Sequence, residues 1–170
     1  MSTPIRVALL PMSALQEKVC DGLGALAKAH KQLIDDSLRP SFADSLEIDE
    51  SLKQGNEQGN RWDYLLGHEA SAVVVGLEPH SAYTREVSAV IAKKNAARQQ
   101  LKRHLADAGK ISAWFWVASG RVDFAPHDKV LRRLEQEGIT FVGGKLREKD
   151  LRLPTKPVKG PGRKRRPARA

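Results

Sequence analysis

The sequence has a single cysteine and no long hydrophobic run. Cys20 alone cannot form an internal disulfide or a cysteine-based zinc site. No apolar run approaches the ~20 residues that span a bilayer. The apolar stretch Ile5–Pro11 is too short, and too soon interrupted by proline, for a signal peptide. We therefore expect a cytoplasmic protein in a reducing compartment. Ser-His-Asp, Cys-His and dinucleotide-binding patterns are also missing, so enzyme classes that depend on them find no support.

Acidic residues are absent from the end of the chain. Residues 156–170 carry seven of the nine net positive charges, on Lys156, Lys159, Arg163, Lys164, Arg165, Arg166 and Arg169. Because no large apolar residue follows Val158, we predict one domain over residues 1–150 and a disordered basic tail over residues 151–170. A dense cationic segment gains affinity for polyanions by releasing counterions, so the expected partner is nucleic acid, either DNA or RNA. The alternative is a solubilising or localising tail. Residues 162–167 also resemble a nuclear localisation signal, so the compartment would be nuclear in a eukaryote and nucleoid-associated in a bacterium.

Hydrophobic periodicity predicts an α/β domain with a mixed β-sheet flanked by helices. Apolar residues at helical spacing predict helices over residues 13–36, 82–108 and 126–138. Apolar runs predict strands over residues 62–67, 72–80, 111–119, 121–124 and 139–142. Residues 44–49 fit a short strand or a helix that continues through Leu52, and residues 53–60 have the composition of a loop.

Two carboxylates in this layout could act together. A turn centred between Ala70 and Ser71 would place Asp63 opposite Glu78, with Cβ atoms ~5 Å apart on one face. The two-residue period of a strand puts His80 on that face as well. Neighbouring carboxylates repel unless a cation lies between them. Oxygen ligands with open water positions suit Mg²⁺ or Mn²⁺, so the pair predicts a divalent metal site.

The order of elements and the residues Trp62-Asp63-Tyr64-Leu65-Leu66 and Glu78-Pro79-His80 resemble the PD-(D/E)XK nuclease superfamily over residues 13–118. That resemblance implies a restriction-endonuclease-like core and phosphodiester hydrolysis, with Asp63 and Glu78 as catalytic metal ligands. His80 stands where the family has lysine, and it would orient or deprotonate the attacking water. The family also allows an acidic residue on the first helix, where Glu17 and Asp21 are available.

Lys94 lies near the middle of the apolar side of the helix expected over residues 82–108. It resembles the lysine that some members of the superfamily carry on this helix. The alternative is a lysine whose ammonium group reaches out to solvent. About ten residues separate Lys94 from the helix start, which is ~15 Å and places it far from Glu78.

The missing Glu-x-Lys motif keeps a second interpretation open: a non-catalytic nucleic-acid-binding or scaffolding protein on the same fold. Trp114 and Trp116 could stack bases in an exposed groove, but their apolar neighbours favour core positions. Gly143-Gly144-Lys145 lacks the spacing of a phosphate loop and indicates a turn that ends a strand.

Overall fold

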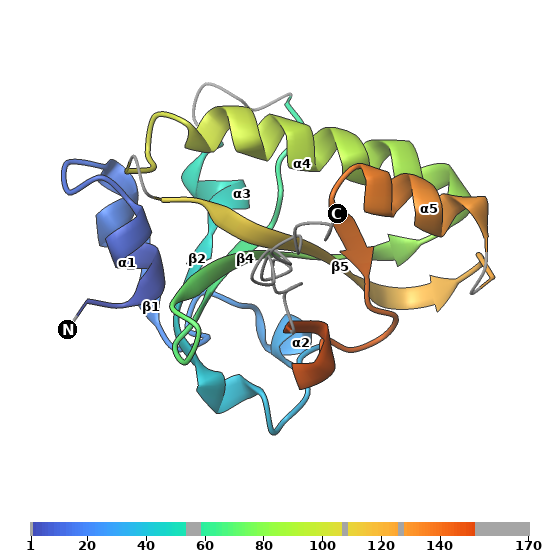
Figure 1. The fold of residues 1–170 in the computed structure, drawn as a ribbon, viewed down its shortest axis with the longest axis horizontal. Helices are drawn as coiled ribbons and strands as arrows, with labels where there is room; N and C mark the ends of the chain where they lie inside the picture. The colour runs from blue at the N-terminus through green and yellow to red at the C-terminus, as the bar shows by residue number, and fades with distance from the viewer. Residues whose placement is uncertain (1, 54–58, 107–108, 126–127, 152–170) are drawn as a thin grey trace, which may run out of the picture.

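The computed structural model describes residues 2–53, 59–106, 109–125 and 128–151, which form a six-stranded mixed sheet with helices on its faces (Figure 1). The strands lie side by side in chain order, as β1 (Cys20–Asp21), β2 (Phe42–Glu47), β3 (Tyr64–His68), β4 (Val73–Ala82), β5 (Ile111–Val122) and β6 (Ile139–Phe141). The helices are α1 (Pro4–Ala8), α2 (Lys28–Lys31), α3 (Ile48–Ser51), α4 (Val87–Leu101) and α5 (Lys129–Gln136). The predicted α/β class with a mixed sheet is confirmed.

The direction of the strands changes midway across the sheet. Strands β1 to β4 pair antiparallel with their neighbours, whereas β4, β5 and β6 run parallel. Parallel neighbours need a crossover connection, and α4 and α5 supply the two crossovers. Both helices cover the same face of the sheet (Figure 1).

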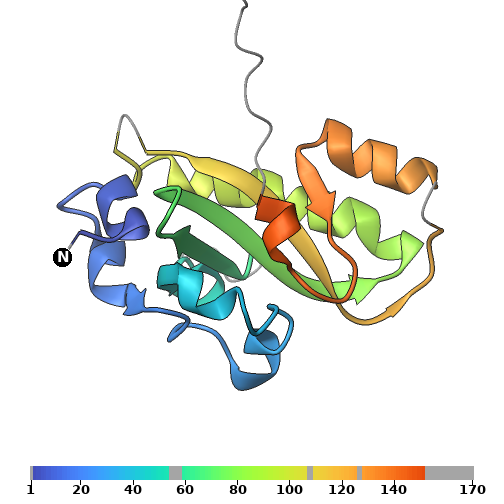
Figure 2. The same ribbon diagram turned by 60° about the horizontal axis from the view of Figure 1, so that its bottom comes forward.

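Each face of the sheet has its own hydrophobic core. Under α4, Trp114 and Trp116 pack with Val90 and Leu101. On the opposite face, where Figure 2 shows α2 and the neighbouring turns, Leu66 and Phe115 pack with Leu26 and Ile34. Both tryptophans are buried, at 6% and 0% exposure, so they belong to the core and present no stacking surface.

The predicted helix over residues 13–36 is wrong. The structure has a 3₁₀ turn at Ala14–Lys18, then β1, then the single turn of α2. Gly22, with a φ of +54°, turns the chain where the helix would continue. The apolar residues of this segment also serve both cores, because Leu15 packs on the α4 face and Leu26 on the other. Their helical spacing therefore does not mark one face of one helix.

Smaller differences concern where elements begin and end. β5 continues to Val122, where it pairs with Ala82, and the expected turn at residues 119–121 is replaced by a shift in the register between β4 and β5. β2 ends at Glu47 and α3 follows, so the strand and helix interpretations of residues 44–52 each hold for part of that segment. Gly143, with a φ of +75°, lies in the turn after β6, as predicted.

Residues 152–170 of the predicted basic tail, and residues 54–58 of the loop expected at 53–60, lie outside the described residues, whereas Leu151 ends a 3₁₀ helix that begins at Glu148. Among the helices of the described part, none has the length and apolar character needed to cross a membrane.

Candidate functional site

The hairpin of β3 and β4 brings Asp63 and Glu78 together. Its pairs run from Tyr64 opposite Leu77 to His68 opposite Val73, which is the register predicted from the sequence. Asp63 directly precedes β3, and its backbone N–H donates a hydrogen bond of 2.9 Å to Glu78 Oε2. The two acidic residues therefore lie side by side at the end of the hairpin that is remote from its turn.

Lys93 of α4 is the third member of this group. Its Nζ forms a hydrogen bond and ion pair with Glu78 Oε1 and lies 3.6 Å from Asp63 Oδ1. Chain geometry explains the meeting: four residues of β4 beyond Glu78 extend ~13 Å at ~3.3 Å each. Nine residues from Thr84 to Lys93 return ~13.5 Å along the helix at ~1.5 Å each. The helix therefore passes back over the sheet and places Lys93 above Glu78.

Burial sets the protonation of these groups. The Glu78 side chain is 0% exposed, and this desolvation, together with the charge of Asp63, raises the pKa of Glu78 to about 8, against the influence of Lys93. Burial also raises the pKa of Asp63, again against Lys93. For Lys93, burial lowers the pKa, but the neighbouring carboxylates outweigh it and the pKa rises.

The directions for Lys93 and Glu78 compete, because a raised Lys93 pKa requires an ionised Glu78, whereas a pKa of about 8 keeps Glu78 protonated at neutral pH. The complete burial of Glu78 favours its protonated form, and the more accessible Asp63, 23% exposed, remains beside the ammonium group. We therefore assign one proton to Glu78 and the negative charge to Asp63 at neutral pH.

His80 lies two residues beyond Glu78 on the same strand face, as predicted. Its Nε2 is 3.8 Å from Glu86 Oε2, and its Nδ1 is 3.1 Å from the Ser81 carbonyl oxygen. Its ring meets Trp116 edge-on, with centroids 6.3 Å apart. Among the described contacts, His80 touches neither Asp63 nor Glu78, so it lies beside the carboxyl pair without contacting it.

Lys94 points away from this group. Its ammonium donates a hydrogen bond to the carbonyl oxygen of Glu137, directly after α5. Burial lowers its pKa, and Arg98 adds to that effect. Cations interact favourably with the carbonyl end of a helix, so Lys94 joins α4 to the end of α5. The ammonium group of Lys94 therefore contacts a backbone carbonyl oxygen and does not reach out to solvent, which was the alternative that the sequence offered.

Sequence reasoning selected Lys94 and missed Lys93. The signal that could have found Lys93 is the helical row of Glu86, Val90, Lys93 and Ala97, spaced by three or four residues. This row faces the β3 side of α4, whereas Lys94 lies at the centre of the buried side. Asp21, expected as a family-like acidic residue, forms an ion pair of 3.0 Å with Arg6 and is 91% exposed.

The capacity of the site for a metal ion rests on two carboxylates. Within the described ranges, no group of three or more His, Cys, Asp or Glu side chains could hold a metal ion. Asp63 and Glu78 could supply two oxygen ligands where the Lys93 ammonium now lies. Nearby, Asp49 forms an ion pair of 2.8 Å with Arg61. A cation at Asp63 and Glu78 would thus complete its coordination with water or substrate.

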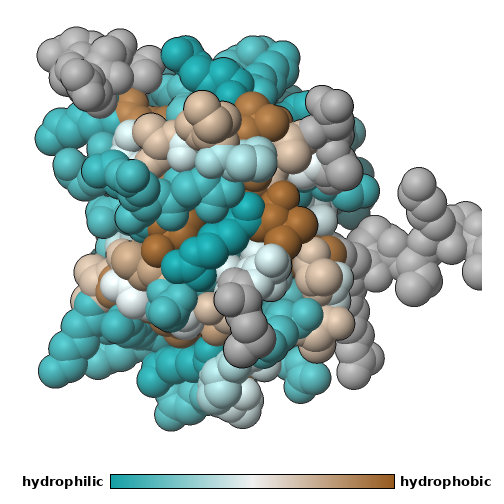
Figure 3. Space-filling model, turned by 90° about the vertical axis from the view of Figure 1, so that its left-hand side faces the viewer, coloured by the Kyte–Doolittle hydropathy of each residue, from teal (hydrophilic) through white to brown (hydrophobic). Residues whose placement is uncertain are grey.

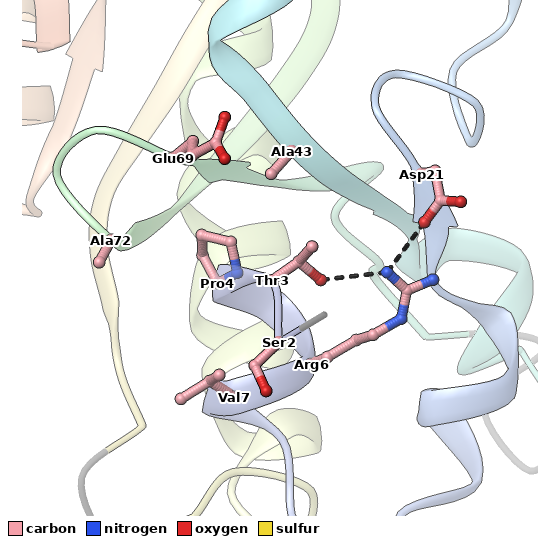
Figure 4. A pocket seen from close by; sticks show the side chains of 9 residues that line it. All are labelled: Ser2, Thr3, Pro4, Arg6, Val7, Asp21, Ala43, Glu69 and Ala72. Carbon is pink, nitrogen blue, oxygen red and sulfur yellow. Dashed lines mark hydrogen bonds and ion pairs between the residues drawn. The ribbon is translucent and has the colours of Figure 1, made fainter.

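Another pocket lies at the corner between α1 and the β3–β4 turn. It measures about 560 Å³, and Figure 4 shows Arg6 joined to Asp21 and Thr3 on one side, with Glu69 apart from them. Its principal cation is therefore already paired. On the side of the molecule that carries α1, hydrophilic surface divides the hydrophobic areas (Figure 3). Neither feature places reactive groups together as the β3–β4–α4 site does.

Comparison with protein-family models, with curated proteins and with solved structures finds no match to this chain.

Proposed function

We propose that this chain is a nucleic-acid-binding protein with a metal-dependent, phosphodiester-cleaving site formed by Asp63, Glu78 and Lys93. The observation that carries the proposal is that the carboxyl groups of Asp63 and Glu78 both lie against the ammonium nitrogen of Lys93. A buried contact between a carboxyl group and a lysine adds little to stability by itself, because the cost of desolvating the charged groups offsets most of their attraction. A buried carboxyl with a strongly raised pKa beside a second carboxyl is typical of functional sites.

The order of elements supports a PD-(D/E)XK-like core. An antiparallel meander of β2, β3 and β4 precedes α4, and β5 then returns parallel to β4. Asp63 opens the middle strand and Glu78 lies on the third, as the resemblance requires. Lys93 on α4 takes the role that the resemblance gives to a lysine displaced from the strand. The departure is the first helix, because residues 13–36 form turns instead.

In this proposal Mg²⁺ or Mn²⁺, held by Asp63 and Glu78, would lower the pKa of a bound water and stabilise charge on the phosphoryl group. Glu78 must lose its proton to act as a ligand, so binding releases a proton. Lys93 would exchange its contact with Glu78 for a phosphate oxygen or the attacking water. His80, on the same strand face as Glu78, would accept a proton from a water beside the carboxyl groups.

A second candidate is a non-catalytic nucleic-acid-binding protein. The Lys93 ammonium already occupies the position between the two carboxyl groups, and the described residues offer no group of three metal ligands. Together with the absence of a Glu-x-Lys motif, these features fit a site that has lost its metal.

The test is cleavage of single- and double-stranded DNA and RNA with Mg²⁺ or Mn²⁺ by the full chain and three variants. We expect Glu78→Gln and Lys93→Met each to lower the rate at least about 100-fold, the scale of losing one preorganised charged group. Binding should stay within about twofold of wild type, since phosphate contacts elsewhere dominate affinity. Lys94→Met is the matched control, because its ammonium contacts Glu137 and lies outside the site.

Cleavage that persists in Glu78→Gln would mean that another site is responsible. Loss of cleavage in Lys94→Met with activity retained in Lys93→Met would reverse the assignment of the lysine. Binding without cleavage by wild-type protein, in either metal, would establish the non-catalytic alternative.

A further inference from the structure

Two adjacent hollows lie along the last turns of α4 and share the side chains of Arg98 and Lys102. The first measures about 220 Å³ and lies between α4 and the start of β5. Its floor is apolar, formed in part by Leu101 and Trp114, and its rim carries Arg98, Lys102 and Lys110. The second hollow, on the other side of the shared pair, is lined in part by Asn95 and Gln99.

Among the described residues, the three rim cations have no acidic partner. All three are exposed, and over the described residues no ion pair involves them and no acidic side chain lines either hollow. Some other surface cations are paired, as Arg39 is with Asp36 at 2.7 Å. The positive field also reaches inward, because Arg98 adds to the burial that lowers the pKa of Lys94. Within the part of the chain that the structure describes, the end of α4 thus presents positive charge without a neighbouring carboxylate.

We propose that Arg98, Lys102 and Lys110 bind the backbone phosphates of nucleic acid, as a contact surface of the folded domain separate from the basic tail. This inference rests on the proposed function for its choice of partner. Phosphate oxygens are typically contacted by arginine and lysine together with amide side chains, and Asn95 and Gln99 flank the pair.

The spacing of the cations fits a nucleic-acid strand. Arg98 and Lys102 are four residues apart on one helix face, which separates their Cβ atoms by ~5–6 Å. Phosphates follow one another at ~3.4 Å of axis along each strand of duplex DNA, so the pair can reach neighbouring or alternate phosphates. Arg98 lies five residues beyond Lys93, or ~7.5 Å along the helix axis. The same five residues turn the helix by about 140°, so the contact surface and the carboxylate site lie on different sides of α4.

The test compares the salt dependence of duplex DNA binding by the full chain and by the triple variant Arg98→Gln, Lys102→Gln, Lys110→Gln. The slope of log affinity against log salt should become shallower by up to about 2.7, since each phosphate contact contributes about 0.9. The control, Lys129→Gln, Arg132→Gln, Lys149→Gln, removes the same charge from exposed positions elsewhere. The control slope should change by less than one contact, or less than about 0.9.

Equal changes in both triple variants would overturn the proposal, because the effect would then be one of net charge. An unchanged slope in the Arg98, Lys102, Lys110 variant would also overturn it, as would wild-type protein that binds no DNA. Vesicles of phosphatidylserine and phosphatidylcholine form a further arm. Loss of vesicle binding in that variant, with its DNA slope unchanged, would assign the surface to a membrane.

These measurements do not depend on turnover. If the triple variant has a shallower salt slope and the wild-type protein cleaves no substrate, the contact surface is supported and the nuclease proposal is rejected. If the wild-type protein cleaves nucleic acid and the triple variant has an unchanged salt slope, the nuclease proposal is supported and the contact surface is rejected.

Discussion

At the scale of single residues, the buried Glu78 makes the stability of the fold depend on pH. Its pKa is raised to about 8 by burial, whereas an unfolded glutamate titrates near ~4.3. Between these values the folded protein holds a proton that the unfolded chain has lost. The contribution is complete below the unfolded pKa and disappears as pH rises through the folded one, so the free energy of unfolding falls with pH in this window. The raised pKa of Asp63 acts with the same sign.

We predict that the urea midpoint of wild-type protein decreases between about pH 5 and about pH 8, and that Glu78→Gln flattens this decrease. Glutamine keeps the size of the side chain but does not titrate, and the change for Lys93 falls at higher pH, outside the window. Parallel pH profiles for the two proteins would show that the Glu78 carboxyl does not carry the proton assigned to it.

At the scale of elements, the fit of β4 against the tryptophan layer depends on Gly76. A Cβ atom at this position would lie 2.6 Å from the Trp114 ring and 3.0 Å from Trp62 Nε1. The two indoles meet edge to face, with centroids 5.1 Å apart and planes at 85°. Trp62 Nε1 is buried and has no hydrogen-bond partner among the described residues.

We predict that Gly76→Ala destabilises the fold by about 1–3 kcal/mol, because overpacking forces the indoles and the strand apart. Gly120→Ala is the control on the neighbouring strand, since nothing lies within 4 Å of a Cβ there. Its effect on the urea midpoint should correspond to at most about 0.5 kcal/mol. Comparable midpoints for the two variants would mean that the tryptophans repack at no cost.

Elements from β3 to β6 were predictable from sequence because each is long or strongly patterned. β4 has a continuous apolar run because both of its faces are buried. α4 has apolar residues at helical spacing because one of its sides is buried. The carboxylate pair followed from the turn position alone. The first half of the chain was not predictable in the same way, because α2 and α3 are single turns and their apolar neighbours pack on different faces.

The prediction of the lysine was wrong for a different reason. It considered the position of each lysine around the helix, but not where α4 crosses β4. Lys94 is more central on the buried side, but Lys93 is the residue that the return of α4 places over Glu78. A pattern on one element cannot give the crossing of two elements.

At the scale of the whole molecule, the charge is divided unequally between domain and tail. Residues 156–170 hold seven of the nine net positive charges and no large apolar residue beyond Val158. We predict that deleting them leaves the melting temperature within about 1–2 °C, because no packing surface of consequence is removed. Engagement of seven phosphates would contribute a salt slope near −6 on duplex DNA, and this contribution should disappear with the tail.

The measurement is a DNA-binding titration of the truncated and full chains at several salt concentrations. A truncated chain that binds as tightly as the full chain, with the same slope, would contradict the assignment of the tail. A residual slope of the size expected for three contacts would instead point to the end of α4.

The ammonium group of Lys93 has a consequence for how the protein can be handled. Because Glu78 holds a proton at neutral pH and the ammonium group lies beside the charged Asp63, the fold does not need a bound ion to prevent repulsion between the two carboxyl groups. Chelating agents should therefore leave the purified protein folded and soluble, and they provide a reversible way to stop any metal-dependent reaction. Samples for crystallisation with intact nucleic acid could be prepared in this way from the unmodified chain.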